Sequence, residues 1–264
     1  MQVDDRRSKL LEVIRRKGFA SLPDLAGEMQ VSESTVRRDL DRLEENGAAK
    51  RTHGGVFYTG SSPNLPHFDI RQSLSLQKKK EIAQAAAELI DDGDSILLDG
   101  GTTTYELAQL LVGRHVHVVT NSLPVANLFA SAAESDLVLI GGYILHRTGV
   151  AVGPTAAQML ADLRVRRAML SVASVAEGGF FNNNLLIVEA ERAMMRAADE
   201  VIVLADSTKF GHQSLAQLCE LSEVDKIVSD HELADHWRAT FEQAGGEAII
   251  AAPFPSAAKS ESLA

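Results

Sequence analysis

The stretch that most constrains this fold is residues 31–44, Val-Ser-Glu-Ser-Thr-Val-Arg-Arg-Asp-Leu-Asp-Arg-Leu-Glu. Ser32 is a favourable helix N-cap, and an apolar stripe follows it at helical spacing, at Val36, Leu40 and Leu43. Hydroxyl and guanidinium groups lie away from that stripe in the first turns. Asn46-Gly47 predicts the end of the helix, because both residues tolerate left-handed backbone. Such a helix is typical of one that enters a nucleic-acid groove.

The segments on either side of this helix predict a complete winged helix-turn-helix. Residues 22–29 predict a second helix that begins near Pro23, and the turn between the two helices is tight. Residues 4–17 predict a supporting helix that Gly18 ends. Residues 48–56 predict a β-hairpin wing with a basic flank. These segments together define an N-terminal DNA-binding domain, residues 1–57.

This N-terminal pattern resembles the DeoR family of bacterial transcriptional regulators. The resemblance rests on Val31-Ser32, Thr35-Val36-Arg37-Arg38-Asp39-Leu40, Leu43-Glu44, Gly47 and Arg51-Thr52-His53-Gly54-Gly55. The expected DNA contacts are polar or basic: Ser32, Ser34, Thr35, Arg37, Arg38, Arg42, Lys50, Arg51 and His53. His53 is equally consistent with a turn residue. We expect Asp39 to form an internal salt bridge or cap rather than to read a base.

The net charge of −10 does not exclude DNA binding, because the acidity is unevenly distributed. Residues 1–55 carry 11 Lys and Arg against 10 Asp and Glu, whereas residues 56–264 carry 15 against 26. Phosphate contact depends on local clusters of basic side chains and not on whole-chain charge. The acidity therefore belongs to the second domain.

Composition also bears on where the protein is located and on which cofactors it can bind. No apolar run approaches the roughly 20 residues of a membrane span, and no signal-peptide pattern opens the chain, so we expect a cytoplasmic protein. Cys219 is the only cysteine, which excludes an intrachain disulfide, and we expect it to be a small buried apolar residue. His115 and His117 lack neighbours at metal-ligand spacing. We predict neither a metal nor a cofactor.

Beyond the wing, composition predicts a linker and then an α/β domain. Residues 58–67, which include Gly60, Pro63 and Pro66, favour an extended linker. The helix expected from Lys78 to Ile90 starts with three lysines, which we interpret as a solvated helix start. Residues 95–98, 116–119, 137–140, 168–172, 201–204, 226–229 and 248–250 are expected strands, most of them separated by helices. This alternation predicts a mostly parallel α/β sheet over residues 68–252, followed by a disordered tail, residues 253–264.

We expect the ligand-binding residues in the loops that follow these strands, because ligands of open α/β sheets bind outside the carboxyl ends of the strands. Asp99-Gly100-Gly101-Thr102-Thr103-Thr104 joins glycines, hydroxyls and a helix N-terminus, which favours phosphate binding. Each loop alone is equally consistent with plain connection geometry. The candidate effector residues are Asp99, Gly100, Gly101, Thr102, Thr103, Thr120, Asn121, Ser122, Gly141, Gly142, Glu189, Asp206 and Lys209.

These segments are similar to the DeoR-type effector domain, which resembles ribose-5-phosphate isomerase and is associated with phosphorylated sugars. The resemblance implies that Asp99 and Asn121 hold sugar hydroxyls, and that Thr102, Thr103 and Lys209 hold the phosphate. Residues 171–175 depart from the pattern, because no carboxylate follows until Glu177. An isomerase needs such a base, so the departure favours binding over turnover. Residues 180–184 are expected to supply an apolar, amide-rich lip.

We therefore predict a DNA-binding regulator that represses a carbohydrate-metabolism operon and responds to a phosphorylated sugar or related metabolite. A homodimer or homotetramer is expected, because paired modules match paired operator half-sites. Two alternatives remain open. One is a sugar-phosphate isomerase with an added DNA-binding module, and the other is a DNA-binding protein whose second domain binds no ligand and serves oligomerisation.

Overall fold

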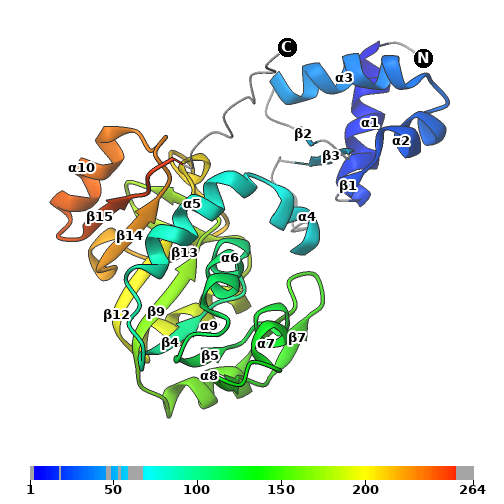
Figure 1. The fold of residues 1–264 in the computed structure, drawn as a ribbon. Coiled ribbons are helices and arrows are strands. Elements are labelled where there is room, and N and C mark those ends of the chain that lie inside the picture. The colour runs from blue at the N-terminus through cyan, green and yellow to red at the C-terminus, as the bar shows by residue number, and fades with distance from the viewer. Residues whose placement is uncertain (1–2, 18, 46–48, 53–54, 59–67, 254–264) are drawn as a thin grey trace, which may run out of the picture. The chain divides into compact units, whose positions relative to one another are not determined.

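The computed structural model describes residues 3–17, 19–45, 49–52, 55–58 and 68–253, and it divides the chain into two compact units, Met1–Leu74 and Ser75–Ala264 (Figure 1). His53, residues 59–67 of the expected linker and residues 254–264 of the expected tail lie outside the described residues. No helix in the described ranges is both long and apolar enough to cross a membrane.

The first unit is the predicted winged helix-turn-helix. Its helices are α1 (Val3–Lys17), α2 (Leu22–Met29), α3 (Glu33–Glu45) and α4 (Phe68–Ser73). Its three-stranded antiparallel sheet has the order β1-β3-β2, with β1 at Phe19–Ala20, β2 at Ala49–Thr52 and β3 at Gly55–Tyr58. Ser21 caps α2 by accepting a bond from the Asp24 N–H, and Gln30 ends it in left-handed backbone. Leu10, Ile14, Leu25, Leu40 and Val56 form a shared core.

The second unit contains a parallel sheet that confirms the predicted α/β class. Within the described residues this sheet has seven strands in the order β15-β14-β12-β9-β4-β5-β6, and every neighbouring pair is parallel. The strands are β4 (Ser95–Leu98), β5 (His117–Thr120), β6 (Asp136–Leu139), β9 (Val165–Ser171), β12 (Ala198–Leu204), β14 (Lys226–Ser229) and β15 (Glu247–Ile250).

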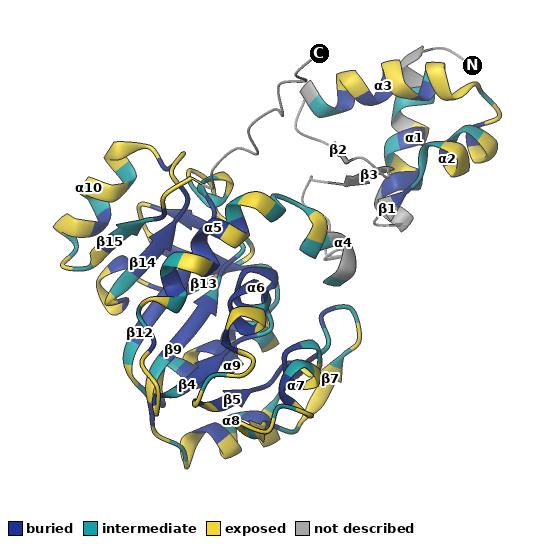
Figure 2. Ribbon diagram, in the orientation of Figure 1, coloured by how far each residue is buried: buried dark blue, intermediate teal, exposed yellow. Residues whose placement is uncertain are grey.

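Helices cover both faces of this sheet. Core contacts place α5 (Leu76–Ala87), α6 (Thr102–Leu111) and α7 (Leu123–Phe129) on one face, and α8 (Pro154–Ala161), α9 (Leu185–Arg196) and α10 (Asp235–Gln243) on the other. Successive strand residues point to opposite faces, so Ile96 and Leu98 join the first core and Leu97 joins the second. The five central strands, β14, β12, β9, β4 and β5, are accordingly buried along most of their length (Figure 2), whereas the edge strand β6 is mostly exposed.

Besides the parallel sheet, the second unit contains short antiparallel strands, which the sequence did not predict. β7 (Tyr143–Leu145) and β8 (Val150–Val152) form a hairpin, and β10 (Ser174–Ala176), β11 (Gly179–Asn182) and β13 (Ala216–Cys219) form a three-stranded sheet. The expected lip at residues 180–184 is wrong, because Phe180 and Phe181 are buried in β11. The Phe180 ring packs edge-to-face against Phe241, with the ring centroids 6.1 Å apart.

The start of α5 also differs from the prediction. Lys79 is buried, and Lys78 forms ion pairs with Asp230 and Glu232, so only Lys80 of the three lysines is exposed. The lysine run is therefore not a solvated helix start. Periodicity could not reveal this, because the acidic partners lie far along the chain.

Candidate functional site

The exposed face of α3 carries the candidate DNA-contacting side chains. Val36, Leu40 and Leu43 are buried, as their spacing predicts. The Ser32 hydroxyl caps the helix by accepting a bond from the Thr35 N–H at 3.3 Å. Five candidate side chains on or next to α3 are exposed, Ser32, Ser34, Arg37, Arg38 and Arg42, and Thr35 is half-buried. The helix therefore presents hydroxyls and guanidiniums to solvent while its apolar side holds the core.

Asp39 confirms its predicted structural role. It is only 2% exposed, and its carboxylate accepts bonds from Arg6 Nε at 2.6 Å and Arg7 Nε at 3.2 Å. Because both arginines lie on α1, this ion pair fixes α3 against the supporting helix. Asp39 is thereby excluded from reading a base.

The wing is present as the antiparallel pair β2 and β3. In its backbone register Lys50 lies opposite Phe57, and Arg51 lies opposite Val56. Position 53 falls outside the described residues, so the DNA contacts expected of Lys50, Arg51 and His53 stay predictions.

In the second unit, the point where the strand order reverses lies between β4 and β9. The chain continues from β4 to β5 on one side, while β9 and β12 lie on the other side. Ligands of open α/β sheets bind outside such a switch point. Asp99 directly follows β4, and its Oδ2 accepts bonds at this point from the Ser171 N–H at 2.8 Å and the Ser171 hydroxyl at 3.0 Å.

Asp99 organises the loop that follows β4. Its Oδ1 also accepts bonds from the Gly101 N–H at 2.9 Å and the Thr104 hydroxyl at 2.5 Å. Four donors fill the acceptor capacity of a carboxylate. Burial raises the pKa of Asp99, and these bonds oppose that rise. The arrangement assigns Asp99 to holding its own loop, rather than to the sugar hydroxyl that the resemblance implied.

Gly100 and Gly101 are required by the protein's own packing. A Cβ at Gly100 would lie 1.9 Å from Val150 Cγ1, and a Cβ at Gly101 would lie 1.4 Å from Ser171 Oγ. From the sequence, we interpret these glycines as part of a loop that favours phosphate binding. The structure gives a packing reason for them, namely that neighbouring elements close over this loop.

The N-terminus of α6 opens at the same place. Its N-cap is Gly101, which offers no side chain to cap the first-turn N–H groups. Thr102 and Thr103 lie in that turn and are buried, at 7% and 5% exposure. Uncapped N–H groups and the helix dipole favour an anion, and the threonine hydroxyls add donors.

The loop after β5 contains one buried acceptor without a partner. Thr120 donates to the Leu98 carbonyl at 2.7 Å, and Ser122 caps α7 by accepting from the Val125 N–H at 3.3 Å, so both have structural partners. Asn121 Nδ2 donates to the Ala151 carbonyl at 2.8 Å, which fixes the amide orientation. Its Oδ1 is buried and has no hydrogen-bond partner among the described residues. The Ser174 hydroxyl, at the start of β10, is in the same situation.

Three of the other predicted positions, Gly141, Gly142 and Glu189, show no contact with these residues in the described part of the chain. Gly142 is exposed, and its φ of 149° with a Cβ position 2.7 Å from the Val152 carbonyl explains the glycine by backbone geometry. The neighbouring Gly141 N–H contacts Met159 Sδ at 3.3 Å. Glu189 lies on the exposed side of α9.

The buried carboxyl of α9 is Glu191, which the sequence prediction missed. It is 4% exposed, and Asn182 Nδ2 lies 2.7 Å from both of its carboxyl oxygens. Burial, followed by the charge of Asp99, raises the pKa of Glu191 well above its ordinary value. A signal was present, because Glu191 falls on the stripe of Val188 and Met194, where a charged residue is unexpected.

The expectation that no carboxylate lies near residues 171–175 is wrong. Residues 171–175 contain none, but Asp99 bonds directly to Ser171. A carboxylate is therefore close in space although it is distant in sequence. Asp99 and Glu191 both accept hydrogen bonds from other residues of the protein, so both carboxyls have structural roles.

The loop after β12 supplies the remaining candidates. Asp206 is 1% exposed and accepts bonds from the backbone and hydroxyl of Thr208. Lys209 follows in a short 3-10 turn, Ser207–Lys209, and is half-buried. Within the described part of the chain Lys209 Nζ forms no ion pair. The Lys209 ammonium can therefore bind an anion.

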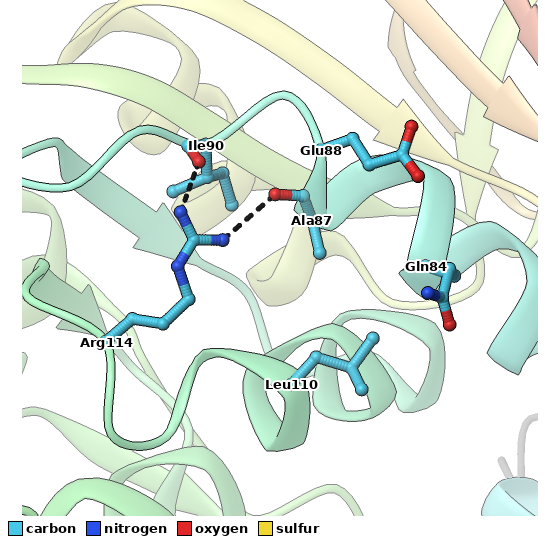
Figure 3. Close-up of a pocket in the computed structure, with 6 residues that line it drawn as sticks. All are labelled: Gln84, Ala87, Glu88, Ile90, Leu110 and Arg114. Carbon is cyan, nitrogen blue, oxygen red and sulfur yellow. Dashed lines mark hydrogen bonds between the residues drawn. The ribbon is translucent and has the colours of Figure 1, made fainter.

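A pocket of about 530 Å³ lies at the opposite, amino-terminal edge of the strands (Figure 3). It is lined by Gln84, Ala87, Glu88, Ile90, Leu110 and Arg114. The Arg114 guanidinium donates to the Ala87 and Ile90 carbonyls at the end of α5, so it satisfies a helix C-terminus. This pocket is therefore a structural capping site and not the candidate effector site.

Comparison with known proteins agrees with this two-unit organisation. The DeoR-like helix-turn-helix domain matches residues 6–61, and the DeoR C-terminal sensor domain matches residues 75–231. The glycerol-3-phosphate regulon repressor of Haemophilus influenzae is 32% identical over 226 residues, which are 85% of this chain and 88% of the relative. The lactose phosphotransferase system repressor of Lactococcus lactis is 32% identical over 242 residues, which are 90% and 95% of the two chains.

A solved structure of ribose 5-phosphate isomerase A from Methanocaldococcus jannaschii aligns with 50% of this chain and 53% of its own, at 21% identity and a TM-score of 0.37. Values this low imply nothing about function. The family matches, in contrast, cover both units. This chain belongs to the DeoR family of transcriptional regulators.

Proposed function

We propose that the protein is a repressor of a carbohydrate-metabolism operon in the cytoplasm, and that a phosphorylated sugar or related metabolite modulates its operator binding. Two relatives are named as repressors, one of a glycerol-3-phosphate regulon and one of a lactose phosphotransferase system. The protein is a regulator and not an enzyme, in keeping with the relatives' names.

The DNA contacts in this proposal come from α3. Arg37, Arg38 and the hydroxyls of Ser34 and Thr35 lie in its first turns. Guanidiniums of this kind bind guanine edges or phosphates. One small module contacts little DNA, so two copies of the chain bind paired half-sites.

The observation that carries the effector proposal is that two buried polar atoms close to the switch point, Asn121 Oδ1 and Ser174 Oγ, have no hydrogen-bond partner among the described residues. A buried polar atom left without a hydrogen bond costs about 1–3 kcal/mol. The Asn121 amide nitrogen is already bonded to Ala151, so the oxygen needs a donor from elsewhere. A sugar hydroxyl supplies one. Two such atoms near a switch point support a polyhydroxylated ligand.

In this proposal the phosphate of that ligand binds cationic and N–H groups that follow the carboxyl ends of β4 and β12. The uncapped N-terminus of α6, with Thr102 and Thr103, binds the phosphate oxygens, and Lys209 adds an ammonium from the loop after β12. A neutral sugar would leave these groups without a counter-charge. The phosphorylated form is therefore the preferred effector class.

Trp237 provides a direct test. It is the only tryptophan of the chain, and its ring centroid lies 5.6 Å from that of Phe210, the residue after Lys209. Titration with ribose 5-phosphate, fructose 6-phosphate, glycerol 3-phosphate and inorganic phosphate should change its fluorescence for a binding compound. At about 100 times the dissociation constant, the same compound should raise the unfolding free energy by roughly 2.7 kcal/mol.

Lys209→Ala should blunt this response and the effect of the compound on operator affinity, while operator binding itself is retained. Lys80→Ala, which removes an exposed lysine of α5, is the matched control and should respond as the wild type does. A normal response in Lys209→Ala would remove Lys209 from the site. A protein that no compound in this panel affects would favour the ligand-free oligomerisation alternative.

A further inference from the structure

The first turn of α5 is bonded to the loop that contains Lys209. Lys78 Nζ donates to the Ser207 hydroxyl at 2.6 Å and to Glu232 Oε2 at 2.8 Å, and it lies 3.3 Å from Asp230 Oδ1. Ser207 and Lys209 are the two ends of one 3-10 turn. A displacement of that turn therefore acts directly on Lys78.

Asp230 holds the loop and the lysine together. It is fully buried, and it accepts bonds from the Ser207 N–H at 2.6 Å, the Ser207 hydroxyl at 2.9 Å and the Glu232 N–H at 3.1 Å. Burial alone would raise the pKa of Asp230, but the Ser207 bonds, the Glu232 N–H and the charge of Lys78 hold it below its ordinary value. Asp230 is thus a buried carboxylate that contacts the Lys78 ammonium directly and also through the shared Ser207 hydroxyl.

Such an arrangement is sensitive to small movements. A buried ion pair is strong only while its hydrogen bonds are complete, because the surroundings screen it weakly. The Lys78 side chain is 17% exposed, so water replaces its contacts poorly. One turn further along α5, Glu81 Oε2 contacts His231 Nδ1 at 2.9 Å, which ties the same helix to the same loop after β14. A movement of these loops therefore acts on two successive turns of α5.

The position of α5 in the chain makes this contact relevant to DNA binding. The first compact unit ends at Leu74, and α5 begins at Leu76. A change in the direction or stability of the first turn of α5 is passed along the backbone to the DNA-binding unit. This step needs only the covalent connection and no contact between the units.

We propose that the Lys78–Ser207–Asp230 contact couples occupancy of the effector loop, residues 206–209, to α5 and thereby to operator binding. The inference rests on the proposed function and adds the residues that transmit the response. Ligand binding at Lys209 displaces the turn, Ser207 leaves Lys78, and α5 loses the anchor of its first turn. Lys78 is a positioning residue that contacts neither the effector nor DNA.

The test uses the full-length protein and the variants Lys78→Met and Ser207→Ala. Lys80→Met removes the same charge from an exposed position on the same helix and is the control, and Lys78→Arg keeps the charge. Amide hydrogen exchange of residues 206–211 is measured with and without a duplex from the gene's own promoter region. Binding linkage is reciprocal, so operator DNA must change the protection of this loop if the loop controls DNA binding.

We expect the duplex to change loop protection in the wild type, in Lys80→Met and in Lys78→Arg, and to have no effect on it in Lys78→Met and Ser207→Ala. A parallel arm measures duplex affinity with and without ribose 5-phosphate. A coupling of about 5- to 150-fold is typical of allosteric proteins, and it should fall to within twofold in the two uncoupled variants. The fluorescence response of Lys78→Met at Trp237 should persist, because Lys78 lies outside the effector loop.

Different results separate the relay from the proposed function. If Lys78→Met and Ser207→Ala keep the wild-type change in protection, the relay is wrong while the proposed function stands. If the wild type binds the duplex without any change in residues 206–211, the relay is also wrong. If the wild type binds no promoter duplex, the proposed function itself fails. Ser207→Ala removes only one hydroxyl, so it keeps the test valid if Lys78→Met does not fold.

Discussion

Arg38 and Asp39 are neighbours on α3 with opposite environments. Arg38 is exposed, while Asp39 is 2% exposed and paired with Arg6 and Arg7. Consecutive helix residues are separated by about 100° around the axis, so one can face solvent while the next faces α1. Charge type therefore does not decide the role of a residue in this helix. Its position relative to the apolar stripe does.

Arg38→Ala should weaken operator binding and leave the fold intact, because the side chain has no part in the core. If Arg38 reads a base, the loss should be about 1–3 kcal/mol and specific to one operator position, whereas a phosphate contact would give a uniform loss and reduce the salt slope by about 1. Gel-shift titration at several salt concentrations distinguishes these cases. Unchanged affinity would remove Arg38 from the DNA interface.

Glu191 predicts a pH dependence of stability. Burial and the charge of Asp99 raise its pKa above the ordinary value of 4.5. The folded state then binds more protons than the unfolded state, so this residue's contribution to stability falls as pH rises from about 4.5 through the folded-state pKa. Glu191→Gln mimics the protonated form. Its free energy of unfolding relative to the wild type should increase as pH rises across this range.

Urea unfolding at a series of pH values measures this difference. Glu189→Gln removes the same charge from the exposed side of α9, so it should leave the pH profile close to that of the wild type. Parallel profiles for the wild type and Glu191→Gln would show that Glu191 is ionised normally in the folded protein.

At the scale of elements, the short hairpin β7–β8 shapes the candidate site. The Leu123 N–H donates to the Gly149 carbonyl and the Ala151 N–H to the Asn121 carbonyl, each at 2.8 Å. Val150 then lies so close to Gly100 that no side chain fits there. Strands of this length are not stable alone, because they depend on contacts with distant segments. That dependence explains why local sequence patterns did not reveal them.

Gly100→Ala should displace this hairpin from the loop after β4. Overpacking of this kind costs about 1–3 kcal/mol, and the displacement should also weaken the response to effector, because Asn121 is bonded to β8. Chemical unfolding and the Trp237 titration measure the two effects. The comparison is Gly27→Ala in α2, where a Cβ meets nothing within 4 Å and removal of a helical glycine should stabilise by up to about 1 kcal/mol. Equal effects of the two substitutions would contradict the packing argument.

At the scale of the whole molecule, charge is divided between the units. Residues 1–55 are close to neutral, with 11 Lys and Arg against 10 Asp and Glu, and the remainder is acidic. We therefore expect the first unit to bind DNA through a local basic cluster rather than through a large positive surface. A single copy should bind weakly, and two copies acting together should supply operator affinity.

An operator with two half-sites should bind the protein far more tightly than a single half-site, with a spacing near one helical turn or a multiple of it. Fluorescence anisotropy with duplexes of one and two half-sites measures this difference. The logarithm of affinity should fall with the logarithm of salt concentration, by roughly 0.9 for each phosphate contacted. Equal affinity for the two duplexes would indicate that the chain binds DNA as a monomer.

The sequence alone determined the helix-turn-helix and the parallel strands of the second unit. Caps, helical spacing and apolar runs are local, so Ser32, Val36 and Leu40 predicted α3, and β4 and β14 have their predicted bounds. Dense local motifs were also sufficient for the family resemblance. The patterns behind these predictions involve only residues near one another in the chain.

The tertiary structure decided which polar groups remain able to meet a ligand. Asp99 meets Ser171 across 72 positions of sequence, and Lys78 meets Ser207 across 129. Because of these contacts Asp99 holds its own loop, and Lys78, which the sequence suggested was solvated, is bonded to a distant loop. Hydrogen-bonding capacity is a property of the folded surroundings, because it depends on donors and acceptors that only the packing of distant strands and helices brings together.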